Sequence, residues 1–448
     1  MLRAGGEDRK SAEGRGGFDA MNAQGGRTTF EDPELQRGIM RLRQVDNYTN
    51  LLYLLREYVS LATVAAGAIL FAQNRAVWGL GWGWNVPVFA VAVVLMGAIQ
   101  HRLAGLGHEA SHYSFLKNRV LNDLVPDLFC MFPLLTTVHF YRLFHMAHHQ
   151  FTNDPGRDPD LQNFGEWKRA DEFPMTRGRF IRVIYFALVV APVRFLRYQW
   201  AYTEINVLGQ GKNAYVDGGK KGLKARAGAG LRLGTALGIG YVLGFNVLTW
   251  ALTKLGRPDL LIPAGLSAYA MAVVVTLQLP ESTLFRSPFR QAYSPRVASV
   301  VRLGFFTLLF EVLAHLRWAT GGISAIYFTV LWFVPMLSSF TFFLFLRDVY
   351  QHSNADDGRL TNSRVFFTDP FTRWAIFVYG QDMHIPHHLF PAIPHYRLPD
   401  LHELLKRSHG DYQRLVVETH GTFHDSMGRT TILDEMTRPR ASVEANLH

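Results

Sequence analysis

Hydrophobic positions along the chain gather into blocks of about twenty residues rather than into the one-sided stripes of soluble helices. A helix of about 20 apolar residues is long enough to cross the hydrocarbon core of a bilayer. The pattern therefore predicts an all-α, polytopic membrane protein with a transmembrane helical stem. Short turns join the last four blocks into two hairpins. The blocks are 51–72, 86–103, 231–255, 260–279, 300–316 and 323–346.

Two other apolar regions carry charges and are not expected to cross the bilayer cleanly. The region 121–138 contains Asp123 and Asp127, so it predicts a buried helix or a dip into the membrane. The region 180–200 carries several arginines, which favours an amphipathic helix in the plane of the membrane.

The two ends of the chain differ from its apolar middle. Residues 1–45 are rich in Gly, Arg, Asp and Glu, so we expect a disordered tail without a cleavable signal peptide. A membrane domain is predicted at 46–410, and its first apolar block would direct insertion. Residues 411–448 are predicted to form a C-terminal tail.

Charge is distributed unevenly between the loops. Basic residues concentrate in the loops 205–230 and 281–299, and basic loops stay on the cytoplasmic side. Both termini and the loops 104–182 and 347–448 are therefore expected in the cytoplasm. The formal net charge of +10 then suits loops that face an anionic leaflet. No basic stripe is interleaved with aromatic residues, so nucleic acid is not an expected partner.

Histidine concentrates in three motifs, all on the predicted cytoplasmic side. The first motif is H-E-A-S-H with His108 and His112, the second is H-M-A-H-H with His145, His148 and His149, and the third is H-I-P-H-H with His384, His387 and His388. Residues i, i+3 and i+4 share one face of a helix, so each motif can direct its imidazoles to one place. Imidazole suits iron, zinc, copper or nickel. The single cysteine, Cys130, excludes a thiolate metal site within one chain.

These histidines exceed the needs of one ion. A single centre would use three or four imidazoles, so two metals that share a nitrogen-rich site fit better. The repeated Glu-x-x-His of carboxylate-bridged di-iron bundles is absent. His352, at the end of the last apolar block, is a candidate ninth ligand. Asp348, one helical turn earlier, could reach the metals directly or through water, or could pair with Arg347.

Two rival interpretations use the same residues. A structural zinc site closes at four ligands, which leaves the other histidines unexplained. A metal transporter should carry His or Asp near the bilayer midplane, whereas these motifs flank the spans. Tightly held iron favours an oxidoreductase, and readily exchanged zinc favours a transporter.

The order, spacing and position of the motifs resemble those of the membrane fatty acid desaturase and hydroxylase superfamily. The sequence L-F-P-A-I-P-H-Y-R-L-P at 389–399 is also typical of that family. The resemblance covers roughly residues 50–410 and implies a mushroom-shaped protein with a cytoplasmic helical cap. The cap would hold a histidine-rich di-iron site, with two Fe ions bound by His108, His112, His145, His148, His149, His352, His384, His387 and His388.

Some features depart from the common pattern of that family. The residues 381–383 (Q-D-M) precede the third motif, where many relatives carry Asn. The long separation of His149 and His384 leaves room for one hairpin beyond a four-span core, expected at 231–279. No fused cytochrome domain is expected. These departures leave the substrate open between a free fatty acid, a lipid-linked chain and an acyl-coenzyme A.

The resemblance implies an O2-dependent oxidoreductase that acts on a long hydrocarbon chain from the lipid bilayer. We expect a fatty acid (lipid acyl chain) desaturase. Hydroxylation of a lipid or carotenoid, and oxidative decarboxylation of a fatty acid to a terminal alkene, are the alternatives.

The chain lacks flavin and nicotinamide fingerprints and CxxC pairs, so it is not expected to reduce its own metals. An external electron donor of the ferredoxin, rubredoxin or cytochrome type should dock on the cap, near Arg397 and Lys406. Four phenylalanines of the last span are candidates for lining a substrate tunnel, although packing is the commoner role of such residues. They are Phe340, Phe342, Phe343 and Phe345.

Overall fold

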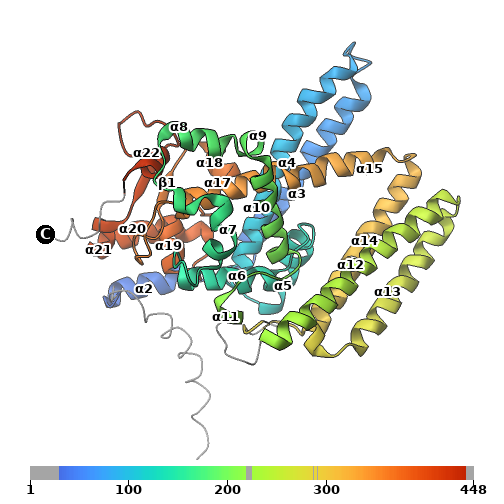
Figure 1. Ribbon diagram of the computed structural model, residues 1–448, viewed down its shortest axis with the longest axis horizontal. Coiled ribbons are helices and arrows are strands. Elements are labelled where there is room, and N and C mark those ends of the chain that lie inside the picture. The colour runs from blue at the N-terminus through green and yellow to red at the C-terminus, as the bar shows by residue number, and fades with distance from the viewer. Residues whose placement is uncertain (1–29, 218–223, 286, 290, 440–448) are drawn as a thin grey trace, which may run out of the picture.

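The protein is almost entirely helical. The computed structural model describes residues 30–217, 224–285, 287–289 and 291–439. In these ranges, long helices project from a lobe built of shorter helices (Figure 1). The described strands, β1 (Val365–Phe367) and β2 (Glu418–His420), pair in parallel with Val365 opposite Glu418. The fold confirms the predicted all-α class.

Among the described residues, six helical segments are long and apolar enough to cross a bilayer, as the six apolar blocks predicted. Leu52, Leu55 and Leu70 of the first segment are 61%, 60% and 56% exposed. Such exposure is unfavourable in water but suits lipid, so the chain is an integral membrane protein. The segments are α3 (Thr49–Asn74), η2 (Trp82–Trp84) with α4 (Asn85–Ser111), α12 (Lys224–Lys254), η6 (Pro258–Leu260) with α13 (Leu261–Gln278), α14 (Pro295–Ala319), and the run of α15 (Ile323–Phe328), η8 (Thr329–Phe333), α16 (Val334–Leu337) and α17 (Ser339–His352).

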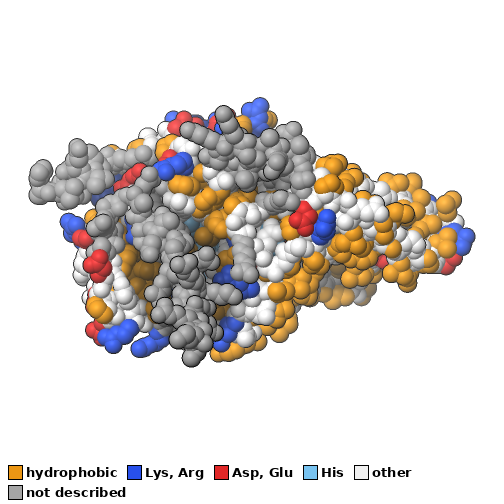
Figure 2. Space-filling model, turned by 90° about the horizontal axis from the view of Figure 1, so that it is seen from below, with side chains coloured by type: hydrophobic (Ala, Val, Ile, Leu, Met, Phe, Trp, Pro, Cys, Tyr) orange, Lys and Arg blue, Asp and Glu red, His pale blue; other side chains and the backbone are white. Residues whose placement is uncertain are grey.

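The spans form two bundles. α4 packs against both α3 and α17. Gly97 permits the close approach of α4 to α17, because a Cβ there would lie 2.6 Å from the backbone nitrogen of Phe340. α12, α13 and α14 pack together separately and form the narrow arm at the right of Figure 2, where hydrophobic side chains cover much of the surface. The α12–α13 hairpin corresponds to the extra hairpin predicted at 231–279.

The first half of the lobe consists of short helices. α5 (Arg119–Pro126) and the π-helical turn η3 (Asp127–Met131) contain buried residues and lie outside the candidate spans, as predicted for 121–138. The region 180–200 is helical and lies outside the candidate spans, as predicted, but it is divided among several helices and does not form the single helix expected. The chain leaves the helical conformation at Ala191, where φ is −141° and ψ is 56°, because the following Pro192 disfavours a helical residue before it. The remaining elements are α6 (Val138–Phe151), α7 (Pro159–Lys168), η4 (Ala170–Glu172), α8 (Arg177–Phe180), η5 (Ile181–Tyr185), α9 (Ala187–Val190), α10 (Pro192–Asn206), α11 (Ala214–Asp217) and η7 (Glu281–Thr283).

Parts of both predicted tails form ordered elements. α2 (Pro33–Leu42) places Leu35 and Ile39 in an apolar cluster with Leu405 of α20 (Leu398–Ser408). Beyond residue 411, β2 pairs with β1, and α22 (Ile432–Thr437) buries Ile432 in the lobe. Residues 1–29 and 440–448 lie outside the described ranges, and the boundaries at 46 and 410 stay predictions. The C-terminal part also contains α18 (Pro370–Ala375), α19 (His384–Leu389), η9 (His395–Arg397) and α21 (Gly410–Leu415).

Candidate metal centre

The three histidine motifs and His352 lie on four helices that meet in the lobe. The first motif closes α4, with His112 as its C-cap, and His352 is the last residue of α17. The second motif lies on α6, which begins after Thr137, whose side chain accepts a hydrogen bond from the amide of Phe140. The third motif occupies the short helix α19. Two candidate spans and two lobe helices therefore supply the site.

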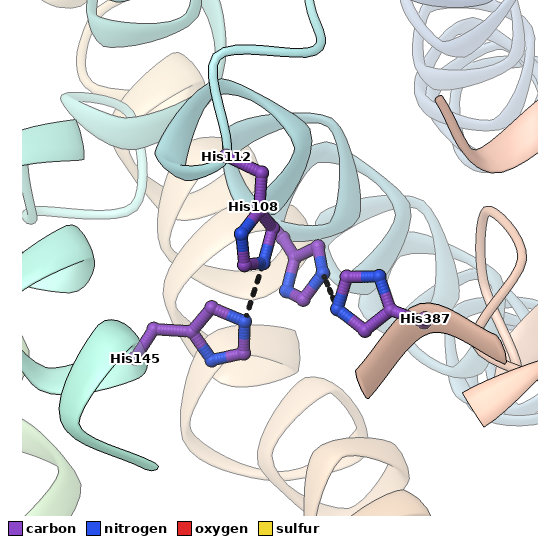
Figure 3. Close-up of side chains that lie close together, drawn as sticks. All are labelled: His108, His112, His145 and His387. Carbon is purple, nitrogen blue, oxygen red and sulfur yellow. Dashed lines mark hydrogen bonds between the residues drawn. The ribbon is translucent and has the colours of Figure 1, made fainter. Parts of the chain in front are cut away.

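The structure brings all nine histidines together. The first histidine group contains His108, His112, His145 and His387, and the second histidine group contains His148, His352, His384 and His388. In each group, one ring nitrogen per residue lies within 4.8 Å of the others. Nε2 of His149 lies 2.9 Å from Nε2 of His145, and its ring stacks on that of His388 with centroids 4.2 Å apart, so His149 contacts both groups. Figure 3 shows the first group, with rings from α4, α6 and α19 directed toward one another.

The spacing of the converging nitrogens fits a set of metal ligands. Nε2 of His112 lies 2.9 Å from Nε2 of His145 (Figure 3), and Nε2 of His352 lies 3.0 Å from Nε2 of His384. Metal–nitrogen bonds of about 2.1 Å would separate neighbouring nitrogens by about 3.0 Å in an octahedron and about 3.4 Å in a tetrahedron. The closest nitrogen pairs, at 2.9, 3.0 and 3.2 Å, therefore lie in the range expected for donors that share one metal ion.

The other ring nitrogen is often held by a polar partner. Nδ1 of His108 lies 3.0 Å from the hydroxyl of Tyr141. Nδ1 of His352 lies 3.2 Å from the carbonyl oxygen of Asn362, to which it can only donate. Such a partner fixes the orientation of the ring and leaves Nε2 as the nitrogen available to a metal.

Burial keeps most of these imidazoles neutral. Desolvation, reinforced by neighbouring groups that include other imidazoles, holds the pKa well below its usual range in His112, His145, His149, His384, His387 and His388. In His148, burial would also lower the pKa, but the carboxylates of Asp158 and Asp160 outweigh it and raise the pKa to about 8. Neutral imidazole is the metal-binding form, so the six rings with lowered pKa need not lose a proton to bind.

Asp158 is a site residue that sequence reasoning missed. Its buried carboxylate lies 3.0 Å from Nδ1 of His148 and also caps α7 by accepting a hydrogen bond from the amide of Asp160. Asp160 lies 3.4 Å from the ammonium of Lys168. The only signal in the sequence was a carboxylate ten residues after His148, and no spacing rule connects the two.

A buried ion pair joins α6, which carries the second motif, to α5. Arg142 of α6 donates to both carboxylate oxygens of Asp123, at 3.0 and 2.5 Å. It also donates to the carbonyl oxygens of Ala110 and Ser111 at the end of α4. Burial would raise the pKa of Asp123, but His139 and Arg142 outweigh it and lower the pKa to about 2. Arg142 therefore holds α6 against α5 through the ion pair and against the end of α4 through the two carbonyl oxygens.

Two further contacts link the first motif to the sequence around the third. The amide nitrogen of Gln381 lies 3.1 Å from Nε2 of His108. The carboxylate of Glu109 accepts hydrogen bonds from the His395 amide and the Ser114 hydroxyl, both at 3.0 Å. In the sequence, residues 381–383 were noted only as a departure from the family pattern.

Asp348 belongs to neither histidine group. Its carboxylate accepts a hydrogen bond from the hydroxyl of Tyr198 at 3.0 Å and pairs with Arg347 at 3.2 Å. This contact with Arg347 is the ion pair that the sequence offered as an alternative, and a role of Asp348 nearer the metals stays a prediction.

Most of the phenylalanines of α17 pack inside the protein. Phe340, Phe343 and Phe345 are buried in apolar clusters, and Phe342 packs against one of them, so their lining of a tunnel also stays a prediction.

Within the described ranges, six candidate membrane helices and two groups of mostly buried histidines define an integral membrane protein with a histidine-rich candidate metal site. The sequence model of the fatty acid desaturase family matches residues 83–277 and 258–420. These matches include all three motifs and His352. The chain belongs to the fatty acid desaturase family, which confirms the resemblance seen in the sequence.

Curated relatives agree with this family. The chain is 30% identical over 168 residues to dihydrorhizobitoxine desaturase from Bradyrhizobium elkanii, which covers 37% of this chain and 44% of the relative. It is 34% identical over 85 residues to sn-1 oleoyl-lipid 12-desaturase from Anabaena variabilis, covering 18% and 24%. It is 29% identical over 120 residues to Delta(8)-fatty-acid desaturase from Euglena gracilis, covering 26% and 28%. The chain thus spans less than half the length of each relative, and together the relatives support a desaturase-type oxidoreductase.

Proposed function

We propose that the protein is an O2-dependent di-iron oxidoreductase that desaturates a long hydrocarbon chain, in the first instance the acyl chain of a fatty acid or lipid. The observation that carries this proposal is the convergence of eight histidines from four helices into two adjacent groups, with a ninth, His149, in contact with both. All nine are the proposed ligands. The family and the names of the relatives support dehydrogenation as the reaction.

Two iron ions are the proposed occupants. Each histidine group offers one set of four nitrogen donors, and His149 is available between them. A six-coordinate metal is proposed over zinc, because four donors for each ion would close a tetrahedral site. Four protein donors on such a metal leave positions free for another molecule. When bound, the irons would supply the O2 chemistry that breaking an unactivated C–H bond requires.

The residues of the chain would position this chemistry and shield it from water. His108 and His387 are 2% and 1% exposed, so bulk water is excluded from the first group. Asp158 and the carbonyl oxygen of Asn362 would keep the Nε2 atoms of His148 and His352 directed inward. Arg142 and Asp123 would maintain the separation of the first and second motifs.

The proposed substrate is a long apolar chain that leaves the bilayer. The first motif and His352 close two candidate spans, so the site lies beside the ends of membrane helices. Two relatives are named for desaturation of an oleoyl lipid and of a fatty acid. Hydroxylation and oxidative decarboxylation differ from desaturation by small changes in substrate position, of about 1 Å, and are therefore the competing outcomes.

An external electron donor completes the proposal. A ferredoxin, rubredoxin or cytochrome would dock on the lobe, on the cytoplasmic side that the basic loops predict. Of the two basic residues suggested for docking, Arg397 donates to the carbonyl oxygen of Arg41, and Lys406 pairs with Glu418 at 2.7 Å. The charge of Arg397 is therefore not balanced by this neutral carbonyl oxygen, whereas the charge of Lys406 is paired with a carboxylate.

Expression in a host that lacks related enzymes, followed by mass spectrometry of total lipids and volatile hydrocarbons, tests the reaction. A product two hydrogens lighter, absent with His145→Ala, is the expected result. A gain of one oxygen would instead identify a hydroxylase. A terminal alkene one carbon shorter, with carbon dioxide released, would identify a decarboxylase. No product, together with readily exchanged zinc, would favour metal transport.

A further inference from the structure

A large cavity lies away from the histidines, within the bundle of α12, α13 and α14. Its volume is about 740 Å³, and sites for small molecules span about 300–1,000 Å³. Apolar residues of the three helices line most of it, and Phe140 of α6 and Leu284 lie at the lobe end. Its lining contains no residue of either histidine group. We call this space the hairpin groove.

Glycines of α12 keep the hairpin groove open. Gly238, Gly240 and Gly244 line it, and a Cβ added at any of them would meet no atom within 4 Å. The lining runs along α12 from Gly234 to Leu248, a rise of about 20 Å at 1.5 Å per residue. One leaflet of the hydrocarbon core is about 15 Å thick. The hairpin groove is therefore long enough for an extended acyl chain of one leaflet.

One charged side chain, Arg302, lines the hairpin groove among the described residues. Its guanidinium donates to the carbonyl oxygen of Leu135 at 2.8 Å and lies 5.4 and 5.9 Å from the ring centroids of Phe140 and Phe306. A guanidinium has five N–H donors and remains charged in proteins, so donors are left for an anion. The neighbouring carboxylate of Asp127 is already bonded by a tyrosine hydroxyl and a backbone amide.

Arg302 lies near the start of α14, at the lobe end of the hairpin groove, and most of the lining beyond it is apolar. This distribution matches the distribution of charge in a fatty acid, with one anionic end and a long apolar chain. Guanidinium and carboxylate form strong, two-pronged hydrogen bonds.

We propose that the hairpin groove binds one long-chain fatty acid, with the carboxylate on Arg302 and the chain along α12. The site is distinct from the candidate metal centre and does not depend on the proposed reaction. The proposed site would also give a function to the α12–α13 hairpin, because these two helices provide most of the lining.

Photolabelling of the full-length protein in phosphatidylcholine nanodiscs tests the proposal. The probe is palmitic acid with a diazirine near its methyl end, and labelled peptides are mapped by mass spectrometry. We expect labelling of α12 to α14 that unlabelled palmitate displaces. Arg302→Gln should reduce this labelling by about tenfold or more, because one charge-assisted pair is lost, while Arg302→Lys should retain part of it.

A second variant guards against a structural effect of changing Arg302. Gly244→Leu should fill the hairpin groove and reduce labelling without touching Arg302. Gly67→Leu is its matched control, since Gly67 lies on α3 outside the groove and its added Cβ also meets no atom within 4 Å. The elution volume in size-exclusion chromatography shows whether each variant is folded, and its metal content shows whether the metal centre is intact. Undiminished labelling in Gly244→Leu or in folded Arg302→Gln, or equal labelling by a photoreactive phosphatidylcholine, would overturn the proposal.

Discussion

Nδ1 of His148 lies 3.0 Å from Oδ1 of Asp158, and both side chains are buried. Nε2 of the same ring faces the second histidine group, 3.2 Å from Nε2 of His352. One carboxylate therefore determines the tautomer and the direction of a candidate ligand. Outer partners of this kind typically contribute about 10- to 100-fold to metal affinity.

Asp158→Asn should lower the metal affinity of the second histidine group by about 10- to 100-fold, because a neutral amide orients the ring less strongly. Iron content after dialysis against graded chelator concentrations measures the effect. Asp411→Asn is the control, since Asp411 forms an exposed pair with Arg414. Equal iron retention in Asp158→Asn and in the unchanged protein would contradict the positioning role.

Replacing one histidine of each group should separate the two proposed metals. His112→Ala and His384→Ala should each lower the iron content and abolish product formation, since each removes a converging nitrogen from a different group. Elemental analysis and the lipid assay measure both effects. His315→Ala is a control, because His315 lies on α14 and contacts the carbonyl oxygen of Glu311 instead. Full iron and full activity in both ligand variants would contradict the di-iron proposal.

Asp123→Asn should destabilise the lobe. It leaves the buried guanidinium of Arg142 without its carboxylate, and breaking a buried pair typically costs about 3–5 kcal/mol. Thermal unfolding in detergent, followed by tryptophan fluorescence, measures the loss. Asp259→Asn should have no measurable effect, because Asp259 and Arg257 form an exposed pair. An unchanged melting temperature in Asp123→Asn would show that the pair does not hold α6 in place.

The carboxyl of Asp127 should make the protein less stable as the pH rises from about 4 to about 6. Burial raises its pKa from 3.8 to about 6, even though Tyr293 and the Val138 amide donate to it. In this window the folded chain keeps a proton that the unfolded chain has lost. The contribution of this carboxyl to the free energy of unfolding is therefore fully present below about pH 4 and is lost as the pH rises through about 6. A shift of about two units corresponds to about 3 kcal/mol.

The Asp127→Asn variant cannot titrate at this position. Its melting temperature, relative to that of the unchanged protein, should therefore rise between about pH 4 and about pH 7. Histidine titration occurs in both proteins and largely cancels in the comparison. A difference in melting temperature that stays constant over this range would show that the pKa of Asp127 is not raised.

The purified protein should not turn over with NADPH and oxygen alone, because its sequence contains no flavin or nicotinamide fingerprint. Addition of a ferredoxin or cytochrome reductase system should restore product formation. Arg397→Glu should then raise the donor concentration needed for half-maximal rate, with a smaller effect at high salt, where exposed charges are screened. Turnover without any added donor protein would refute the requirement.

Local patterns in the sequence determined the spans and the candidate ligands. Apolar blocks of sufficient length predicted all six candidate membrane helices, since crossing a bilayer depends mainly on local composition and length. Helical spacing predicted that each motif would direct its imidazoles to one point. His108 and His112 do enter one group, but the prediction is wrong for the second and third motifs, which each supply both groups. The break at Ala191 was missed because the apolar character of 180–200 continues through Pro192.

Only the tertiary structure decided how the motifs divide between the two groups. His387 and His388 are adjacent in sequence but belong to different groups, and so do His145 and His148. Successive helical residues point about 100° apart, so the group that each ring faces depends on how α6 and α19 pack against α4 and α17. Asp158 contacts His148 on another helix, and Arg302 lines a cavity together with residues of other helices. Neither neighbourhood follows from the local sequence. Packing between helices, which no local pattern encodes, therefore decided both the division of the ligands and the position of the hairpin groove.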